Sequence, residues 1–321
     1  MTRVAVLDDW QGIAEQCADW SGVRARAELV FFGEAFGSED AAARALADFE
    51  VLVAMRERTA FPASLIARLP KLKMISQTGG RARTLDAAAC AARGIVVCNT
   101  GGGAKYATAE LALGLMLAAF RKIPQGDATI RAGRFQEGIV PGIALEGRTL
   151  GLVGLGRLGG RMAHYGAALG MRVLACSPNL TEARAREHGA EFADRDRLLS
   201  ESDAVSLHLV LSERTRGILG ARELGLMRNG AVLVNTSRGP LVDEAALVTA
   251  LREKKIVAAL DVFDAEPLPE GHPLRSLPNT VLTPHLGYNT EDTFERFYRE
   301  SVENVVGFLD GRPVRVAAPP A

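Results

Sequence analysis

The fold follows from one segment near the middle of the chain, Thr149-Leu150-Gly151-Leu152-Val153-Gly154-Leu155-Gly156-Arg157-Leu158-Gly159-Gly160-Arg161. Its apolar start indicates a strand and its glycines a turn; an alanine-rich helix pattern and a second apolar run at 171–175 follow. This order is typical of a dinucleotide site, because the glycines permit a tight turn, close approach of a pyrophosphate and close helix–strand packing. The helix N-terminus also attracts phosphate. We therefore predict cofactor contacts at Gly154, Gly156, Arg157, Leu158 and Gly159.

The composition is that of an ordinary globular protein of about two domains, with 321 residues, 48% of them hydrophobic and 24% charged. Lys plus Arg and Asp plus Glu both number 38, so no net charge attracts nucleic acid or a membrane surface. We expect a small-molecule substrate and neither of those partners. The four cysteines form no CxxC pair or zinc spacing, so we expect free thiols and no metal site. The N-terminal residues predict a strand and lack the apolar core of a signal peptide, which favours a cytoplasmic protein.

Short apolar runs alternate with helical patterns in both halves of the chain. The first half has runs at 4–7, 29–32, 51–55, 74–76 and 95–98, with helices expected at 11–18, 39–49, 62–69 and 84–93. The second half has runs at 150–153, 171–175, 204–209, 231–235, 257–260 and 280–283, and a helical tail at 291–309. Strands that alternate with helices predict an α/β fold with doubly wound parallel sheets.

The two halves are joined by a segment without this alternation. Gly101–Gly103 predicts a loop or hinge, because three consecutive glycines do not form a stable element interior. A long apolar helix is expected from about Thr108, its N-cap, to Lys122, and 124–147 reads as a connection over the surface.

Four side chains suited to hydride-transfer chemistry lie at or just beyond the ends of predicted strands. Arg238 could bind a carboxylate through two parallel hydrogen bonds, and His285 could exchange a proton with a carbonyl oxygen. Asp261 ends the predicted strand at 257–260, and Glu266 opens the proline-rich loop that follows it. Each of these residues, taken alone, could also have a purely structural role. Arg238 could be a surface arginine, and His285 could be a packed histidine. Asp261 and Glu266 could be solvated carboxylates, in which case Asp264 is as good a candidate for the site as either of them. His208, inside a strand, is the rival histidine and is expected to pack near the cofactor.

The ordered motifs resemble those of the D-isomer-specific 2-hydroxyacid dehydrogenases over nearly the whole chain. These motifs are Gly154-x-Gly156-x-x-Gly159, Asn235-Thr236-Ser237-Arg238-Gly239, Asp261-x-x-x-x-Glu266-Pro267, Pro284-His285-x-Gly287, and Asn99-Thr100 before Ala109-Glu110-Leu111-Ala112-Leu113-Gly114. The resemblance implies a flavodoxin-like substrate domain, residues 1–99 and 288–321, and a Rossmann NAD(P)-binding domain, residues 100–287. It also implies an active site in the cleft between them, hinges at Gly101–Gly103 and near Gly287, and a homodimer.

The resemblance further implies a role for each site residue. Arg238 would bind the substrate carboxylate, His285 would be the acid/base, and Glu266 would keep it protonated. Asp261 would contact the nicotinamide, and backbone N–H groups near Gly79, Gly80 and Arg81 would hold the substrate from the other side. The remaining expected contacts are Ser177, His208, Thr236 and Gly287 for the cofactor and Tyr288 for the substrate.

Several positions depart from the pattern of this family. Ser177 stands where NAD-preferring relatives carry an acidic residue, which removes the repulsion against the 2′-phosphate of NADP. No arginine follows at once to bind that phosphate, and Arg184 is the nearest candidate, so NAD is favoured while NADP stays open. Val210 and Tyr288 are also unusual, because the family commonly has a proline at the first of these positions and a small residue at the second. Together with Tyr288, Arg56 and Arg58 indicate an acidic or aromatic-tolerant substrate, unless these arginines pair with surface acids.

The combined prediction is an NAD(P)-dependent oxidoreductase that transfers hydride between the cofactor and a small D-2-hydroxy acid or 2-keto acid, as in glyoxylate and hydroxypyruvate reductases. A phosphoglycerate dehydrogenase-like or phosphite-oxidising enzyme is an alternative, and so is a non-enzymatic module that senses NAD(H).

Overall fold

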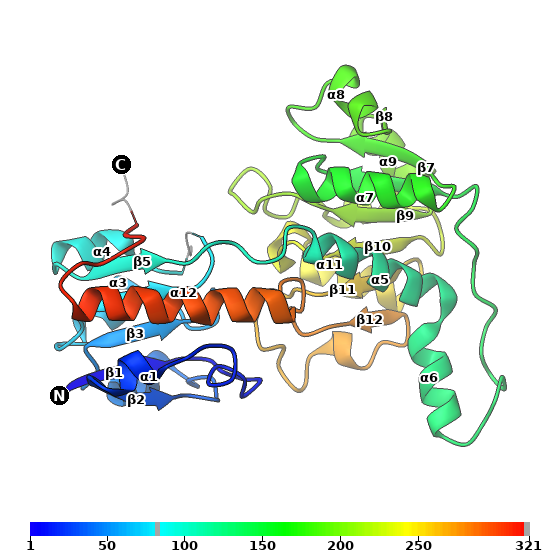
Figure 1. Ribbon diagram of the computed structural model, residues 1–321. Coiled ribbons are helices and arrows are strands. Elements are labelled where there is room, and N and C mark those ends of the chain that lie inside the picture. Colours follow the sequence, from blue (N-terminus) through cyan, green and yellow to red (C-terminus); the bar gives the residue numbers. More distant parts are fainter. Residues whose placement is uncertain (81–83, 318–321) are drawn as a thin grey trace. The chain divides into compact units, whose positions relative to one another are not determined.

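The computed structural model describes residues 1–80 and 84–317 and divides the chain into two compact units (Figure 1). Unit 1 comprises Met1–Lys105 and Asn289–Ala321, and unit 2 comprises Tyr106–Tyr288. Each unit has its own parallel sheet and its own apolar core. The predicted α/β fold with two doubly wound parallel-sheet domains is confirmed.

Unit 1 is built on a five-stranded sheet in the order β2-β1-β3-β4-β5. Its strands are β1 (Thr2–Val6), β2 (Ala27–Phe31), β3 (Val51–Ala54), β4 (Met74–Gln77) and β5 (Val96–Asn99). Its helices are α1 (Ser21–Arg24), α2 (Glu39–Leu46), α3 (Ala63–Ala67), α4 (Ala87–Ala92) and α12 (Glu291–Leu309). Strands such as Val51–Ala54 are buried at every position, because helices cover both faces of a doubly wound sheet.

Unit 2 is built on a seven-stranded sheet in the order β12-β11-β10-β9-β6-β7-β8. Its strands are β6 (Thr149–Val153), β7 (Arg172–Cys176), β8 (Glu191–Phe192), β9 (Ala204–Leu207), β10 (Val232–Asn235), β11 (Val257–Leu260) and β12 (Thr280–Leu282). Its helices are α5 (Ala107–Arg121), α6 (Ile123–Arg131), α7 (Arg157–Ala168), α8 (Glu182–Glu187), α9 (Arg195–Glu201), α10 (Ala221–Leu226) and α11 (Glu244–Arg252), with 3-10 turns η1 (Gly239–Leu241) and η2 (Pro273–Arg275). The strand order reverses between β6 and β9, which is where ligands bind in such sheets.

Three local predictions were wrong, and one short strand was missed. Residues 11–18 form turns and no helix, with a short helix instead at Ser21–Arg24. Thr108 is not the N-cap of α5 but lies inside it, and its hydroxyl donates to the carbonyl of Gly287 (2.7 Å). Part of the expected surface connection is the helix α6, which starts after Lys122 in the left-handed conformation and has Pro124 in its first turn. The short strand β8 was also missed, because two residues show no period.

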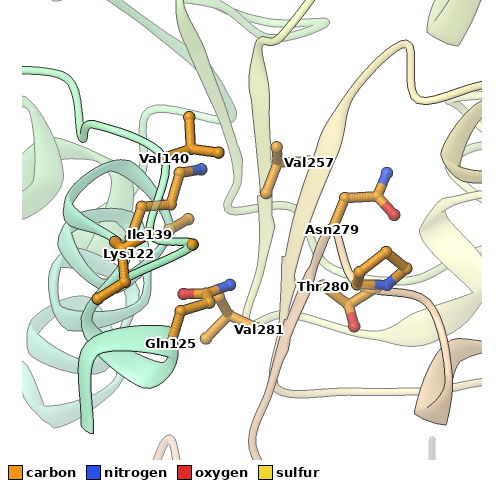
Figure 2. Close-up of a pocket in the computed structure, with 11 residues that line it drawn as sticks. Lys122, Gln125, Ile139, Val140, Val257, Asn279, Thr280 and Val281 are labelled. Atoms are coloured by element: carbon orange, nitrogen blue, oxygen red, sulfur yellow. The ribbon is translucent and has the colours of Figure 1, made fainter. Parts of the chain in front are cut away.

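A hollow of about 260 Å³ lies beside α6, between the corner of α5 and α6 and the strands β11 and β12 (Figure 2). Lys122 and Gln125 line it from the helical side, and Val257, Thr280 and Val281 line it from the sheet. Beyond α6 the chain is extended and carries exposed apolar side chains, including Phe135 and Val140.

The glycine-rich connection is a loop, as predicted, but it belongs to unit 1. The N–H of Gly101 donates to Glu300 Oε2 (2.5 Å), and the N–H of Ala104 donates to Thr293 Oγ1 (2.9 Å), so both bond to α12. A Cβ on Gly103 would lie 2.6 Å from Thr293 Cγ2, which explains the glycine there. Unit 2 therefore begins only at Tyr106 and extends through Tyr288.

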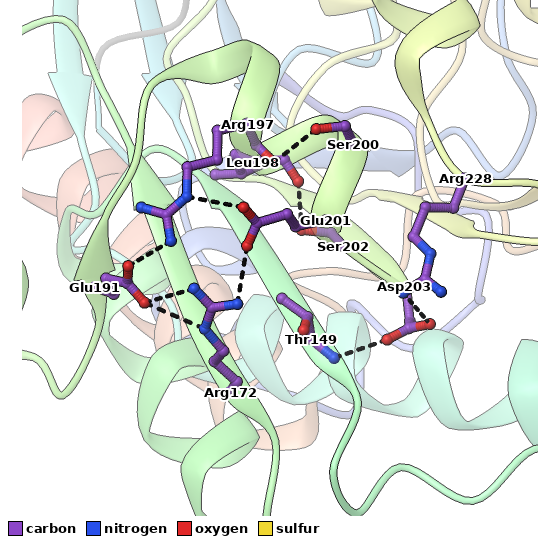
Figure 3. A network of polar contacts seen from close by, with 10 residues as sticks. All are labelled: Thr149, Arg172, Glu191, Arg197, Leu198, Ser200, Glu201, Ser202, Asp203 and Arg228. Atoms are coloured by element: carbon purple, nitrogen blue, oxygen red, sulfur yellow. Dashed lines mark hydrogen bonds and ion pairs between the residues drawn. The ribbon is translucent and has the colours of Figure 1, made fainter.

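A closed ring of charges fastens the outer edge of the unit 2 sheet (Figure 3). Arg172 on β7 bonds to Glu191 on β8 and to Glu201 on α9, and Arg197 on α9 bonds to the same two carboxylates. The four side chains are between 37% and 46% exposed, so each ion pair contributes little to the free energy of unfolding. Its consequence is local, because it fixes the two-residue strand β8 against β7.

Candidate active site

The glycine turn after β6 has the geometry that each glycine was expected to supply. Gly154 adopts φ +103°, and a Cβ there would lie 2.5 Å from the carbonyl oxygen of His208. A Cβ on Gly159 would lie 2.1 Å from the carbonyl oxygen of Gly154, so only glycine lets α7 pack this closely. Gly156 is the N-cap of α7, makes no side-chain cap, and faces open space. The first N–H groups of α7 therefore have the geometry that suits an anion.

Two buried polar atoms just after the ends of β9 and β10 have no hydrogen-bond partner in the described part of the chain, Nδ1 of His208 and Oγ1 of Thr236. The other ring nitrogen of His208 lies 2.9 Å from Ser206 Oγ. Burial lowers the pKa of His208 to about 4, so its ring is neutral near pH 7. A buried polar group without a partner is costly. Both residues were predicted to contact the cofactor, and a bound dinucleotide would supply the missing partners.

A hollow of about 440 Å³ adjoins the end of β7. Its lining includes Ser177 and Pro178, which follow β7, and Asp194 and Arg195, which follow β8. Arg184, the arginine expected from the sequence, is not among the lining residues. Arg195 was missed because it follows β8, which the sequence did not predict.

His285 and Glu266 form a hydrogen-bonded pair, with Nδ1 of the ring 2.6 Å from Oε2 of the carboxylate. The other carboxylate oxygen of Glu266 accepts the N–H of Phe263 (2.9 Å). The side chains are 30% and 32% exposed, so the pair lies at the surface of unit 2 and is not sealed inside it. Burial opposes ionisation of Glu266, but the hydrogen bond and charge of His285 outweigh it and hold the pKa of Glu266 below its usual value.

Asp261 holds the loop that carries His285. Its carboxylate is buried and accepts from the hydroxyl of Thr283 (2.6 Å) and the N–H groups of Leu286 (2.6 Å) and Gly287 (2.9 Å), while burial raises its pKa. Its carbonyl accepts the N–H of His285 (2.9 Å). These bonds stabilise the left-handed φ of +54° at His285, an uncommon conformation for a residue other than glycine. The expected contact of Asp261 with nicotinamide stays a prediction.

Arg238 follows β10 in a segment shaped by Asn235. The amide of Asn235 accepts the N–H of Ser237 (3.0 Å) and donates to the carbonyl of Arg238 (2.8 Å). The backbone at Gly239 packs so closely on Phe263 that a Cβ would lie 2.2 Å from that residue's carbonyl carbon. The charge of Arg238 also contributes to the low pKa of Glu266.

The three predicted catalytic residues thus share one edge of unit 2. Arg238 follows β10, Glu266 follows β11 and His285 follows β12, and these strands are neighbours in the sheet. A guanidinium, a carboxylate and an imidazole at adjacent strand ends can bind an anion and exchange a proton.

Comparison with known proteins identifies the group to which this arrangement belongs. The family model described as "D-isomer specific 2-hydroxyacid dehydrogenase, NAD binding domain" matches residues 113–287. The chain belongs to the D-isomer specific 2-hydroxyacid dehydrogenase family.

Relatives in this family carry two kinds of name. The chain is 41% identical over 256 residues to a glyoxylate reductase from Aeropyrum pernix, covering 77% of this chain and 76% of the relative. It is 38% identical over 275 residues to a D-3-phosphoglycerate dehydrogenase from Archaeoglobus fulgidus, covering 85% of this chain but only 52% of that protein. A phosphoglycerate oxidoreductase structure from Vibrio cholerae has a TM-score of 0.91 and 37% identity over 97% of this chain and all of that one.

These matches confirm the predicted 2-hydroxyacid dehydrogenase family and the predicted NAD cofactor, since the family model is that of an NAD-binding domain. The names dehydrogenase and reductase agree with the predicted oxidoreductase class. The roles of individual site residues stay predictions.

The residues expected to contact the substrate lie in two parts of the chain, Tyr288 in unit 2 and Gly79 to Arg81 in unit 1. The ring of Tyr288 lies edge-on to His285, with 5.9 Å between the ring centroids. In unit 1 the N–H of Gly79 donates to Thr100 Oγ1 (2.7 Å). This N–H was expected to bind substrate, but it is already bonded within the protein. Gly80 is exposed, and Arg81 lies outside the described residues.

The two additional arginines of unit 1 have distinct contacts. Arg56, with φ +53°, covers Gly79 so closely that a Cβ there would lie 2.4 Å from its Nη1. The guanidinium of Arg58 stacks on Trp10, 4.3 Å from the ring centroid, and donates to the side chain of Gln11 (3.2 Å). Arg58 therefore has a structural role, whereas Arg56 lies at a predicted substrate loop.

Proposed function

We propose that this member of the 2-hydroxyacid dehydrogenase family is an NAD-dependent oxidoreductase that interconverts a small D-2-hydroxy acid and its 2-keto acid. The observation that carries the proposal is the His285–Glu266 pair at 2.6 Å, with Arg238 on the neighbouring strand end. A purely regulatory NAD(H)-binding module has no need for this combination.

We propose that the cofactor is held by the N-terminus of α7, with Gly156 against its pyrophosphate, and by Thr236 and His208, whose buried atoms lack partners within the described residues. When bound, its nicotinamide ring supplies or accepts the hydride. Ser177 and Arg195 line the hollow proposed for its adenosine end, and we propose that they decide whether a 2′-phosphate is tolerated.

The residues of the strand-end edge divide the remaining work. Arg238 binds the substrate carboxylate through its two-pronged guanidinium and orients the carbonyl. His285, with Nδ1 on Glu266, directs Nε2 to the substrate oxygen and donates a proton during reduction or accepts one during oxidation. We retain Gly80, Arg81 and Tyr288 as proposed substrate contacts, and Gly79 as a residue that shapes their loop.

A phosphoglycerate dehydrogenase activity is the second candidate. It is favoured by the names of the relatives from Archaeoglobus fulgidus and Vibrio cholerae. Glyoxylate reduction is favoured by the relative that this chain covers more fully.

We also propose a homodimer in the cytoplasm. Exposed apolar side chains gather on α6 and the segment after it, namely Ile123, Ile130, Phe135, Val140 and Ile143. Oε1 of Gln125, in the wall of the adjacent hollow, is buried without a partner among residues 1–80 and 84–317 (Figure 2). All four cysteines are free, which fits a reducing compartment, and the described chain has no helix long and apolar enough to cross a membrane.

Steady-state assays test the activity. Purified protein is assayed with NADH against glyoxylate, hydroxypyruvate and phenylpyruvate, and with NAD against 3-phosphoglycerate. We expect turnover with one substrate group and its loss in Arg238→Ala; cofactor binding without any turnover would contradict the proposal. Light scattering of Ile130→Asp, which we expect to be monomeric, tests the dimer separately.

A further inference from the structure

A second contact links the two segments that carry Arg238 and Glu266. Glu244 is six residues after Arg238, and His272 is six residues after Glu266. Nε2 of His272 lies 3.0 Å from Oε1 of Glu244. The side chains are 15% and 29% exposed, so solvent competes only partly for this contact. The link therefore joins the first residue of α11 to the far end of the Glu266 loop.

The surrounding bonds assign a direction to this contact. Nδ1 of His272 accepts the N–H of Leu274 (3.3 Å) at the start of η2, so in the neutral ring the proton is on Nε2 and is donated to Glu244. The N–H of His272 donates to the carbonyl of Pro269 (3.1 Å). Arg275 donates to the carbonyls of Leu268 (2.6 Å) and Pro269 (2.9 Å). The end of the loop is thus held by several hydrogen bonds around His272.

The loop needs such an anchor because it has no regular structure between β11 and η2. Its start is fixed where Phe263 packs on Gly239, and the seam between the two segments is nearly closed, with a gap of about 10 Å³, the size of one water, lined by Asp264 and Glu244 among others. The other charged groups that act on Asp264 in this seam are Arg216 and Asp243. Glu266 lies between these two fixed ends.

We propose that His272 and Glu244 are positioning residues, which hold the Glu266 loop on the Arg238 segment so that Glu266 stays within hydrogen-bond distance of His285. This inference rests on the proposed function for its kinetic consequences, but the geometry it concerns can be measured without turnover. A displacement of Glu266 by about 1 Å is enough to reduce turnover strongly.

Four variants test the link: His272→Ala and Glu244→Ala remove it, whereas His272→Gln and Glu244→Gln keep a side chain that can form a hydrogen bond to the remaining partner. We expect kcat to fall by about tenfold in the alanine variants with the KM for NADH unchanged, and the glutamine variants to recover most of the loss. The acidic limb of the kcat profile should move to higher pH in the alanine variants, because Glu266 loses part of its contact with His285. His164→Ala, an exposed histidine on α7, is the control.

Proton NMR of the free protein separates this inference from the proposed function. The proton between His285 and Glu266 should give a downfield signal that is lost or shifted in His272→Ala and retained in His272→Gln. The chain has five histidines, so single variants assign the signal. An unchanged signal in a folded His272→Ala protein would overturn the positioning role. If the wild type shows no turnover but His272→Ala loses the signal, the proposed function is contradicted and the positioning role stands.

Discussion

Nδ1 of His285 lies 2.6 Å from Oε2 of Glu266, although the two residues are carried by different loops after β12 and β11. The contact fixes the ring, so that Nε2 faces away from the carboxylate. It also keeps Glu266 ionised, since hydrogen bonding to the charged form lowers the pKa of that carboxyl.

Replacement of Glu266 tests this contact. Because the pKa of Glu266 lies below its usual value, the contribution of the ionised carboxylate is complete above that usual value and is lost as pH falls through the lowered one. Glu266→Gln should lower kcat by about 10²-fold, within the range for acid–base groups, and should abolish this acidic limb. pH profiles of kcat and kcat/KM measure the change; a limb unchanged in the variant would assign it to another group.

Asp261 should stabilise the loop that carries His285. Its oxygens accept from three donors, so Asp261→Asn forces an amide N–H against a donor and leaves a buried group unsatisfied. We expect a loss of about 1–3 kcal/mol in the free energy of unfolding. Denaturant melts provide the value, with the exposed Asp292→Asn on α12 as the control. Equal stability of the two variants would show that the loop does not depend on Asp261.

The glycine turn permits a matched pair of substitutions. Gly156→Ala adds a methyl group into open space, so stability should be kept while the Kd for NADH rises, since the pyrophosphate must approach the backbone there. Gly159→Ala places a methyl group 2.1 Å from the Gly154 carbonyl oxygen and should destabilise the fold itself. Thermal melts and fluorescence titration with NADH separate the two effects. Similar melting losses in both variants would refute the distinction.

His208 should make the stability of unit 2 depend on pH. Its pKa of about 4 in the folded chain lies below the usual value of about 6.5, so below pH 6.5 the unfolded chain binds a proton that the folded chain rejects. Stability is therefore complete above pH 6.5 and is lost as pH falls towards 4, by at most about 3 kcal/mol. His208→Gln should flatten this dependence in denaturant melts at pH 7 and 5. NMR titration of the wild-type ring near pH 6.5 would contradict the argument.

Much of this site was predictable because its residues are defined by local patterns. The spacing of Gly154 and Gly159 is enough to predict their close backbone contacts. Arg238, Glu266 and His285 each follow an apolar run that is a strand in the structure. Parallel strands end at one edge of a sheet, so residues after neighbouring strands meet.

Other features depend on tertiary contacts that no local pattern reveals. Asp261 is an acid at a strand end, and only the folded loop shows that its oxygens hold Leu286 and Gly287. The N–H of Gly79 was expected to be available, yet Thr100 from the next strand end occupies it. The helix α6 was not predicted because Pro124 and Gly126 disfavour a helix. The proline is tolerated here because it lies in the first turn.

Ser177 provides the test of cofactor preference. It lines the hollow at the end of β7 together with Arg195, where an acidic residue would repel a 2′-phosphate and bind the ribose hydroxyls of NAD. Ser177→Asp should therefore raise the ratio of kcat/KM for NADH over NADPH by about tenfold, and Arg195→Ala should raise it by weakening any hold on the phosphate. Arg184→Ala, outside the hollow, is the matched control. If Arg184→Ala changes the ratio and Arg195→Ala does not, the adenosine end binds nearer to α8 than the hollow indicates.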